Sequence, residues 1–224
     1  MSGGGRERPR VKLGVLISGE GTNLQAMIDA IECGQLKADI RVVISNRATA
    51  RGLERARRHG IPAKVISHRG KPREEFDGEL VTTLRGLGVD LVACAGFMRL
   101  LSPVMVRAFP NRIMNIHPAL CPAFPGVDAQ KAATDYGVRF TGCTVFFVNE
   151  GVDDGPIIIQ AVVPVNPEDD AAVIADRIHM QEHRIYPEAI RLYQEGRLAV
   201  RGRKVLIRDA AAPAGQVLIN PPLE

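Results

Sequence analysis

A polar pair, Asn115 and His117, interrupts an otherwise apolar run in the segment RIMNIHP at residues 112–118. If this segment is a strand, both side chains point to the same face, because side chains two residues apart share one side of a sheet. A carboxamide can donate a hydrogen bond to a developing oxyanion, and an imidazole exchanges protons near neutral pH. The spacing therefore allows acyl-transfer chemistry, although a lone histidine beside a turn is as often structural.

A carboxylate that could orient this histidine lies in a second loop. Asp153 stands in GVDDGP, residues 151–156, where glycines bound a short connection between two apolar runs. An acid beside an imidazole can hold the ring in place and favours its cationic form. Asn115, His117 and Asp153 are therefore the candidate catalytic residues, and we refer to them as the trio.

The glycine loop SGEGTN, residues 18–23, could bind a phosphate. It joins an apolar run to an amphipathic segment, so backbone N–H groups at a helix N-terminus would face an anion. Gly19 and Gly21 form only part of the dinucleotide fingerprint, and no ribose-binding acid ends the second predicted strand. A small phosphorylated molecule is favoured over a dinucleotide, and a plain tight turn capped by Thr22 or Asn23 is an equal alternative.

These motifs need a scaffold, and the hydrophobic pattern predicts one. Short apolar runs alternate with segments whose apolar residues recur at helical spacing, which argues for a parallel sheet covered on both faces. The strands are predicted at 12–18, 40–45, 63–67, 90–96 and 112–118, and the helices at 23–34, 52–60, 73–88 and 102–109.

The pattern changes in the C-terminal part of the chain. Two β-rich runs at 139–149 and 155–165, joined by a short glycine loop, predict antiparallel additions to the sheet. A long helix is predicted from about 169–195, with a kink or break at Pro187. After Gly196 the composition predicts an irregular appendage. The expected fold is a single-domain α/β open twisted sheet, mainly parallel and Rossmann-like, with antiparallel C-terminal additions and helices on both faces.

The amino-acid composition limits which classes of partner we expect for this protein. The 224 residues are 46% hydrophobic and 24% charged, as in ordinary globular proteins. The net charge of +4 reflects basic residues gathered near both ends, and aromatic residues are scarce at 4%, so solvated tails are favoured over nucleic-acid binding. No apolar run could span a bilayer and no secretory signal is evident. We expect a cytoplasmic catalytic domain at 12–197, a disordered tail at 1–11 and an appendage at 198–224.

The four cysteines, Cys33, Cys94, Cys121 and Cys143, are far apart and form no C-x-x-C pair. They are expected to be free thiols in a reducing compartment. Cys121 and Cys143 lie near the trio, and they are predicted to be core residues rather than nucleophiles.

Together these motifs resemble those of the folate-dependent formyltransferases. The trio, SGEGTNLQ at 18–25 and AGFMRLLSP at 95–103 carry the resemblance, which covers about residues 12–197. It implies transfer of the formyl group of 10-formyltetrahydrofolate to the amine of glycinamide ribonucleotide, a step of purine biosynthesis. The implied partners are small-molecule substrates, with no metal, no nucleic acid and no membrane, and with either a monomer or a homodimer.

The resemblance also implies residue roles. Direct attack would give a tetrahedral intermediate stabilised by Asn115 and protonated His117, with Asp153 orienting the ring and assisting proton transfer. Phe146 and Asp128 stand where relatives often carry histidine, so auxiliary histidines are not assumed. The implied ribonucleotide contacts are Gly21, Thr22, Asn23 and Glu182, and the implied folate contacts are Arg73, Met98, Arg99, Leu100, Leu101 and Asn115.

Other functions fit parts of the sequence. HMQEH at 179–183 matches the zinc-hydrolase pattern H-x-x-E-H, but no downstream acidic ligand stands in a comparable motif. A formyltetrahydrofolate hydrolase would share the trio, and methionyl-tRNA or sugar-amine formyltransferases usually carry an additional domain for which we expect no room here. A non-catalytic nucleotide-binding module would suit the glycine loop and leave the trio unexplained.

Overall fold

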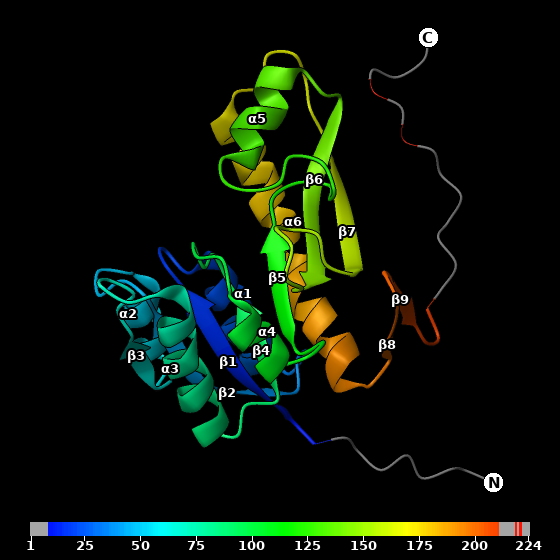
Figure 1. Ribbon diagram of the computed structural model, residues 1–224. Coiled ribbons are helices and arrows are strands. Elements are labelled where there is room, and N and C mark those ends of the chain that lie inside the picture. The colour runs from blue at the N-terminus through cyan, green and yellow to red at the C-terminus, as the bar shows by residue number, and fades with distance from the viewer. Residues whose placement is uncertain (1–8, 211–217, 219, 221–224) are drawn as a thin grey trace, which may run out of the picture.

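The computed structural model describes residues 9–210, 218 and 220. In this part of the chain a mixed sheet has the strand order β3-β2-β1-β4-β5-β6-β7-β9-β8, with helices packed on both faces (Figure 1). The strands are β1 (Val11–Ile17), β2 (Ala38–Ser45), β3 (Ala63–Val65), β4 (Leu91–Cys94), β5 (Ile113–His117), β6 (Phe140–Phe147), β7 (Ile157–Pro164), β8 (Leu198–Arg201) and β9 (Lys204–Ile207). The helices are α1 (Thr22–Glu32), α2 (Gly52–Arg58), α3 (Arg73–Gly86), α4 (Pro103–Ala108), α5 (Ala129–Tyr136) and α6 (Ala171–Gln194).

Strand direction divides the sheet in two. From β3 to β5 every neighbouring pair is parallel. The pairs β5–β6 and β6–β7 are antiparallel, and the β8–β9 hairpin joins the sheet through β9 alongside β7. The predicted fold class, a mainly parallel α/β sheet with antiparallel C-terminal additions, is thus confirmed.

The strand order reverses between β1 and β4, two interior strands of the sheet, and open α/β sheets bind ligands at the carboxyl ends of such strands. The chain moves outward from β1 to β2 and β3, then returns to place β4 on the other side of β1. Helices that follow β1 and β4 therefore lie on opposite faces, and the carboxyl ends of these two strands border the crevice where open α/β sheets bind ligands. The glycine loop after β1 and the segment 95–102 after β4 meet there, since the Ser18 N–H donates to the Gly96 carbonyl at 3.0 Å.

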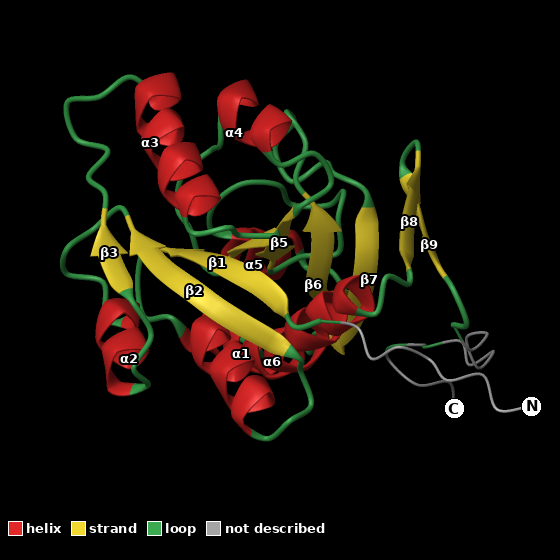
Figure 2. Cartoon of the chain, turned by 90° about the horizontal axis from the view of Figure 1, so that it is seen from below, coloured by secondary structure: helices red, strands yellow, loops and turns green. Residues whose placement is uncertain are grey.

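Two hydrophobic layers cover the sheet (Figure 2). In β1, Leu13, Val15 and Ile17 pack into the layer beneath α1, α2 and α6, while Leu16 packs beneath α3 and α4 on the opposite face. This alternation is the period of two that a strand buried on both faces imposes. It explains why the parallel strands read as continuous apolar runs.

Three features differ from the sequence prediction. Of the kink or break predicted at Pro187, the break does not occur: α6 continues through this buried residue. α5 (Ala129–Tyr136) was not predicted, since its eight residues give too short a periodic signal. The expectation of irregular structure after Gly196 was wrong for β8 and β9, which form a hairpin around the two-residue turn at 202–203.

The two ends are described only in part. The predicted disordered tail at 1–11 falls mostly on residues 1–8, which lie outside the described residues, and β1 already begins at Val11. Most of 211–224 is likewise outside them. None of the helices in the described part is long and apolar enough to cross a membrane. The domain limits and the cytoplasmic location stay predictions.

Candidate active site

His117 lies at the carboxyl end of β5 and is 4% exposed. Its Nε2 is 2.7 Å from the Phe124 carbonyl oxygen, so this nitrogen carries a proton and donates. Its Nδ1 is 3.5 Å from Asp153 Oδ2, an ion-pair separation that is long for a hydrogen bond. Both ring nitrogens thus face acceptors, and only the imidazolium can offer an N–H to each.

Asp153 is held in the 149–155 loop by backbone geometry. Its φ is 48°, in the left-handed region where Asp and Asn are tolerated better than most residues. The same Oδ2 that faces His117 accepts a hydrogen bond from the Gly126 N–H at 2.8 Å. The carboxylate therefore fastens the loop after β5 to the loop after β6 while it faces the imidazole.

Asn115 shares the face of β5 that carries His117, whereas Met114 and Ile116 pack in the opposite layer, as the spacing predicted. The Asn115 side chain is partly exposed, and no hydrogen bond to another described residue engages it. Its register partner on β6 is Phe146, which is 2% exposed. Residues directly opposite in an antiparallel pair share a face, so an apolar ring stands beside Asn115.

The loop that follows β5 is anchored at its start and strained further on. The Thr144 hydroxyl donates to the Ala119 carbonyl at 2.7 Å and accepts from the Cys121 N–H at 3.0 Å. Phe124 and Asp128 have φ of 50° and 57°, both in the left-handed region. Neither the Phe124 carbonyl nor the Gly126 N–H was identified from the sequence, because main-chain groups in a loop leave no residue-type signal.

A second polar cluster joins the start of α1 to the middle of α6. The Asn23 side chain donates to Glu182 Oε2 at 2.9 Å, and the two residues are 8% and 4% exposed. Asn23 Oδ1 and His183 Nε2 are buried and have no hydrogen-bond partner in the described structure. Burial lowers the pKa of His183, and the neighbouring Glu182 carboxylate opposes that shift. The structure thus brings two of the predicted ribonucleotide residues into direct contact.

Gly21 precedes α1 in the left-handed conformation, with φ of 73°. A Cβ at this position would lie 2.7 Å from the Gly52 Cα at the start of α2, which is closer than atoms tolerate. Glycine is therefore required here by the backbone and by the approach of α2. α1 has no side-chain cap, so the N–H groups of its first turn remain available to an anion.

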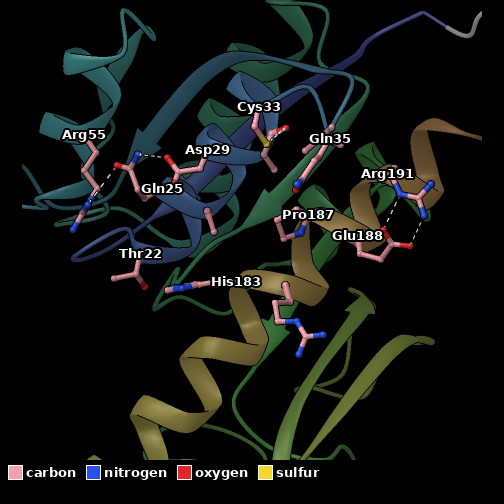
Figure 3. A pocket seen from close by; sticks show the side chains of 14 residues that line it. Thr22, Gln25, Asp29, Cys33, Gln35, Arg55, His183, Pro187, Glu188 and Arg191 are labelled. Atoms are coloured by element: carbon pink, nitrogen blue, oxygen red, sulfur yellow. Dashed lines mark hydrogen bonds and ion pairs between the residues drawn. The ribbon is translucent and has the colours of Figure 1, made fainter.

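A cavity of about 840 Å³ opens between α1 and α6 (Figure 3). Thr22 and His183 line it, together with Gln25, Arg55 and Arg184. No residue of the trio lies in its wall. The cavity runs along α1 from Thr22 to Cys33, and it reaches the second polar cluster through His183 alone, so it does not enclose the candidate site.

The predicted folate residues gather on the other side of the crevice. The segment 98–101 follows β4, and its Met98 N–H donates to the Ser18 hydroxyl at 2.8 Å, while that hydroxyl donates to Asn46 at 2.7 Å. Met98 and Leu100 are 61% and 53% exposed, so apolar side chains face solvent where a ring system could pack. Arg73 is the first residue of α3.

Asp77, which the sequence analysis did not single out, lies beneath this segment. It is 1% exposed and accepts a hydrogen bond from the Ser102 N–H. Burial raises its pKa, while the Ser102 hydrogen bonds and the charges of Arg73 and Arg99 oppose the shift. The acid therefore links α3 to the start of α4 and lies within electrostatic reach of both predicted folate arginines.

The histidines of HMQEH and the cysteines near the trio were the other candidates for chemistry in the sequence. His179 and His183 stack at 6.4 Å between ring centroids, and no group of three or more His, Cys, Asp or Glu in the described residues is arranged to hold a metal ion. Cys143 is buried and burial raises the pKa of its thiol to about 12, which suits the predicted core role; all four cysteines are free.

Comparison with known proteins identifies relatives along most of the chain. Residues 11–190 match the model of the formyl transferase family. A phosphoribosylglycinamide formyltransferase of Haemophilus influenzae is 41% identical, over 90% of this chain and 96% of that protein. The crystal structure of glycinamide ribonucleotide transformylase 1 from Symbiobacterium toebii is 54% identical, with a TM-score of 0.87, over 88% of this chain and 94% of that one.

Longer relatives contain a similar segment. A trifunctional purine biosynthetic protein adenosine-3 of Drosophila pseudoobscura pseudoobscura is 49% identical over 85% of this chain. The match spans 14% of that protein. This chain therefore corresponds to a small part of the trifunctional relatives and to nearly the full length of the single-function ones.

Proposed function

The chain belongs to the formyl transferase family, and from that premise we propose that it transfers the formyl group of 10-formyltetrahydrofolate to the amine of glycinamide ribonucleotide in purine biosynthesis. The observation that carries the proposal is the placement of His117 between the Phe124 carbonyl and the Asp153 carboxylate, with Asn115 on the same face of β5. This arrangement suits stabilisation of an oxyanion and movement of a proton, and it requires no covalent intermediate.

In the proposed reaction the amine nitrogen bonds to the formyl carbon, and the carbonyl electron pair moves onto oxygen. Asn115 donates to that oxygen, because its amide is partly exposed and engaged by no described residue. Collapse of the tetrahedral centre breaks the bond to the folate nitrogen, which leaves with a proton that the attacking amine gives up. Asp153, 3.5 Å from Nδ1, orients the His117 ring that assists this transfer.

The geometry sets one condition on this mechanism. The Nε2–H of His117 is donated to the Phe124 carbonyl, so it must change acceptor before it can reach a substrate oxyanion. Hydrogen bonds of catalytic groups often take their final form only when substrate is bound. We therefore propose that the loop containing Phe124 moves when the two substrates bind.

The second cluster provides the proposed grip on the ribonucleotide. The uncapped first turn of α1, with Thr22 and Asn23, would hold the phosphate through backbone N–H groups and the helix dipole. Glu182, buried and already bonded to Asn23, would accept hydrogen bonds from the hydroxyls or amide of the same molecule. Arg73, Arg99 and the backbone of 98–101 are the proposed folate contacts.

Acceptor dependence tests the proposal. Tetrahydrofolate release from 10-formyltetrahydrofolate should require glycinamide ribonucleotide, and the phosphate-free riboside should be a much poorer acceptor. Rapid release with water alone, unaffected by the ribonucleotide, would mean that the chain is a hydrolase. Exhaustive chelation should leave turnover intact; activity that is lost to chelator and restored by zinc would revive the reading of HMQEH as a metal site.

A test of the proposed phosphate site requires a variant that does not disturb the fold. Gly21→Val is unsuitable, since any Cβ at this position clashes with Gly52. Thr22→Val keeps the shape of the side chain and removes its hydroxyl at the mouth of the cavity. We expect the KM for the ribonucleotide to rise several-fold and the KM for the folate to stay constant. Thr82→Val, which removes an exposed hydroxyl on α3, is the matched control.

A further inference from the structure

The β8–β9 hairpin lies outside the part of the chain that matches the family model, which ends at residue 190. It extends the sheet beside β7, far from the parallel strands (Figure 1). A single register pair, Ile157 with Lys204, connects β9 to β7. Three hydrophobic side chains of the hairpin, Leu198, Val200 and Val205, pack against the hydrophobic layer beneath α6. Its turn makes a separate, polar contact with the rest of the molecule.

That contact is made by Arg203, at the tip of the hairpin. Its Nη2 donates to Asp154 Oδ1 at 2.8 Å and to the Asp154 main-chain carbonyl at 3.0 Å, and its Nη1 lies 3.3 Å from Asp154 Oδ2. The guanidinium thus engages both the carboxylate and the backbone of one residue, in the forked geometry that only arginine offers. The Arg203 side chain also lowers the pKa of Asp154.

Asp154 follows Asp153 directly, in a loop that is also tied to its surroundings by the Gly126 N–H bond to the Asp153 carboxylate and by the Arg107–Glu150 ion pair. Inside the loop, Asn149 donates to the Asp154 carbonyl at 3.1 Å and accepts from the Gly151 N–H at 3.0 Å. Beyond it, Gly155 packs so closely that a Cβ would lie 1.6 Å from the Phe147 carbonyl oxygen. One end of the loop is therefore fixed against β6, and the backbone at Asp154 is fixed by Asn149 and Arg203.

We propose that Arg203 is a positioning residue for Asp153, a role that rests on the proposed function of the trio. By holding the Asp154 carbonyl and carboxylate, Arg203 fixes the peptide that carries the left-handed Asp153, and so sets the 3.5 Å separation between Asp153 and His117. The side chains of Arg203 and Asp154 are 66% and 51% exposed. An exposed ion pair adds little to global stability, so its effect should appear in turnover rather than in the melting temperature.

The test compares Arg203→Ala with Arg201→Ala. Arg201 is an exposed arginine of the same hairpin, and none of the contacts described above involves it. For Arg203→Ala we expect kcat to fall about two- to fivefold, the limit set by an exposed pair, with both KM values within twofold and an unchanged Tm. Arg203→Lys should recover only part of the loss, because an ammonium cannot reproduce the fork. Arg201→Ala should match wild type.

A second measurement does not depend on activity. Histidine side-chain NMR signals, with His117 assigned through His117→Gln, should shift in Arg203→Ala and stay in place in Arg201→Ala. Unchanged His117 signals overturn the proposal whatever the turnover, and so does an unchanged kcat in active enzyme. If wild type transfers no formyl group, the proposed function fails on its own, and the NMR comparison still decides whether Arg203 sets the surroundings of His117.

Discussion

The trio and the Asn23–Glu182 pair are held in opposite ways. The trio lies on one strand and one loop, Asn115 and His117 on β5 and Asp153 in the loop after β6, and its histidine contacts a second loop through Phe124. Phe124 and Asp153 both adopt left-handed backbone conformations. The pair connects two helices and is buried, with its hydrogen bond at 2.9 Å linking residues that are far apart in the sequence. One cluster therefore depends partly on loops, and the other lies wholly on helices.

This difference matches the two tasks that we propose. A binding grip benefits from side chains that are already fixed, because less ordering then accompanies binding. The reacting groups must change partners during the reaction, and His117 must release Phe124 to reach an oxyanion. We therefore expect changes in the trio to lower kcat and changes in the pair to raise the KM for the ribonucleotide.

The largest effect is expected for Asn115→Ala. Loss of one oxyanion donor usually lowers kcat about a hundredfold to a thousandfold. Folding should be retained, because the Asn115 amide bonds to no described residue and its removal leaves no buried group unpaired. Steady-state kinetics with both substrates, and circular dichroism of the variant, are the measurements. Near-wild-type kcat in a folded variant would remove Asn115 from the mechanism.

Asp153→Asn separates charge from geometry. The amide oxygen can still accept from the Gly126 N–H, and asparagine tolerates the left-handed backbone, so the loop should keep its shape. Loss of the negative charge beside His117 should lower kcat roughly a hundredfold, the scale of general acid–base contributions. Glu150→Gln, in the same loop, controls for charge loss alone. Equal kcat for both variants would show that Asp153 acts through the loop rather than through its charge.

Glu182→Gln should affect binding instead. The side chain can still accept from Asn23, but it loses the charge that strengthens hydrogen bonds to the substrate, so the ribonucleotide KM should rise about 10- to 100-fold. The kcat should change only a few-fold. Asp176→Asn removes an exposed carboxylate from the same helix and should have neither effect. A decrease in kcat without a change in KM for Glu182→Gln would contradict the proposed division into a catalytic and a binding cluster.

Much of this arrangement could be predicted from the sequence. Apolar runs and helical periodicity gave the order of strands and helices, because burial on both faces of a parallel sheet leaves that pattern. The shared face of Asn115 and His117 follows from the period of a strand. Local sequence patterns therefore predict where a side chain lies on its own strand or helix.

Contacts between different strands, helices and loops were harder to predict from the sequence. Asn23 was named from the sequence as a possible helix cap, and Glu182 only through the family resemblance. Their contact was not predicted, since nothing local indicates that the start of α1 packs on the middle of α6. The Phe124 carbonyl and the Gly126 N–H are main-chain groups, which any residue could supply. The β8–β9 hairpin was obscured by its charge, because arginines around Gly202 suggested a solvated tail rather than a two-residue turn.

The smallest predicted effect concerns Asp77, a buried acid that belongs to neither cluster. Burial raises its pKa above the usual 3.8, so the native protein holds this proton more tightly than the unfolded chain does. As the pH rises past the unfolded value, the unfolded chain loses its proton first, and the contribution of Asp77 to the free energy of unfolding decreases. Above the raised native pKa the decrease stops, and the full cost of the buried charge is present.

Asp77→Asn removes this titration while its amide oxygen can still accept from the Ser102 N–H. The Tm of the variant minus that of wild type should therefore become more positive as the pH is raised from about 4 to about 7. Thermal unfolding across this range measures the difference, and Thr82→Val, which changes no ionisable group on the same helix, should give a difference independent of pH. A difference for Asp77→Asn that stays flat or becomes more negative would mean that the native structure accommodates the charge without cost. In that case Arg73 and Arg99 would stabilise the carboxylate more than burial destabilises it.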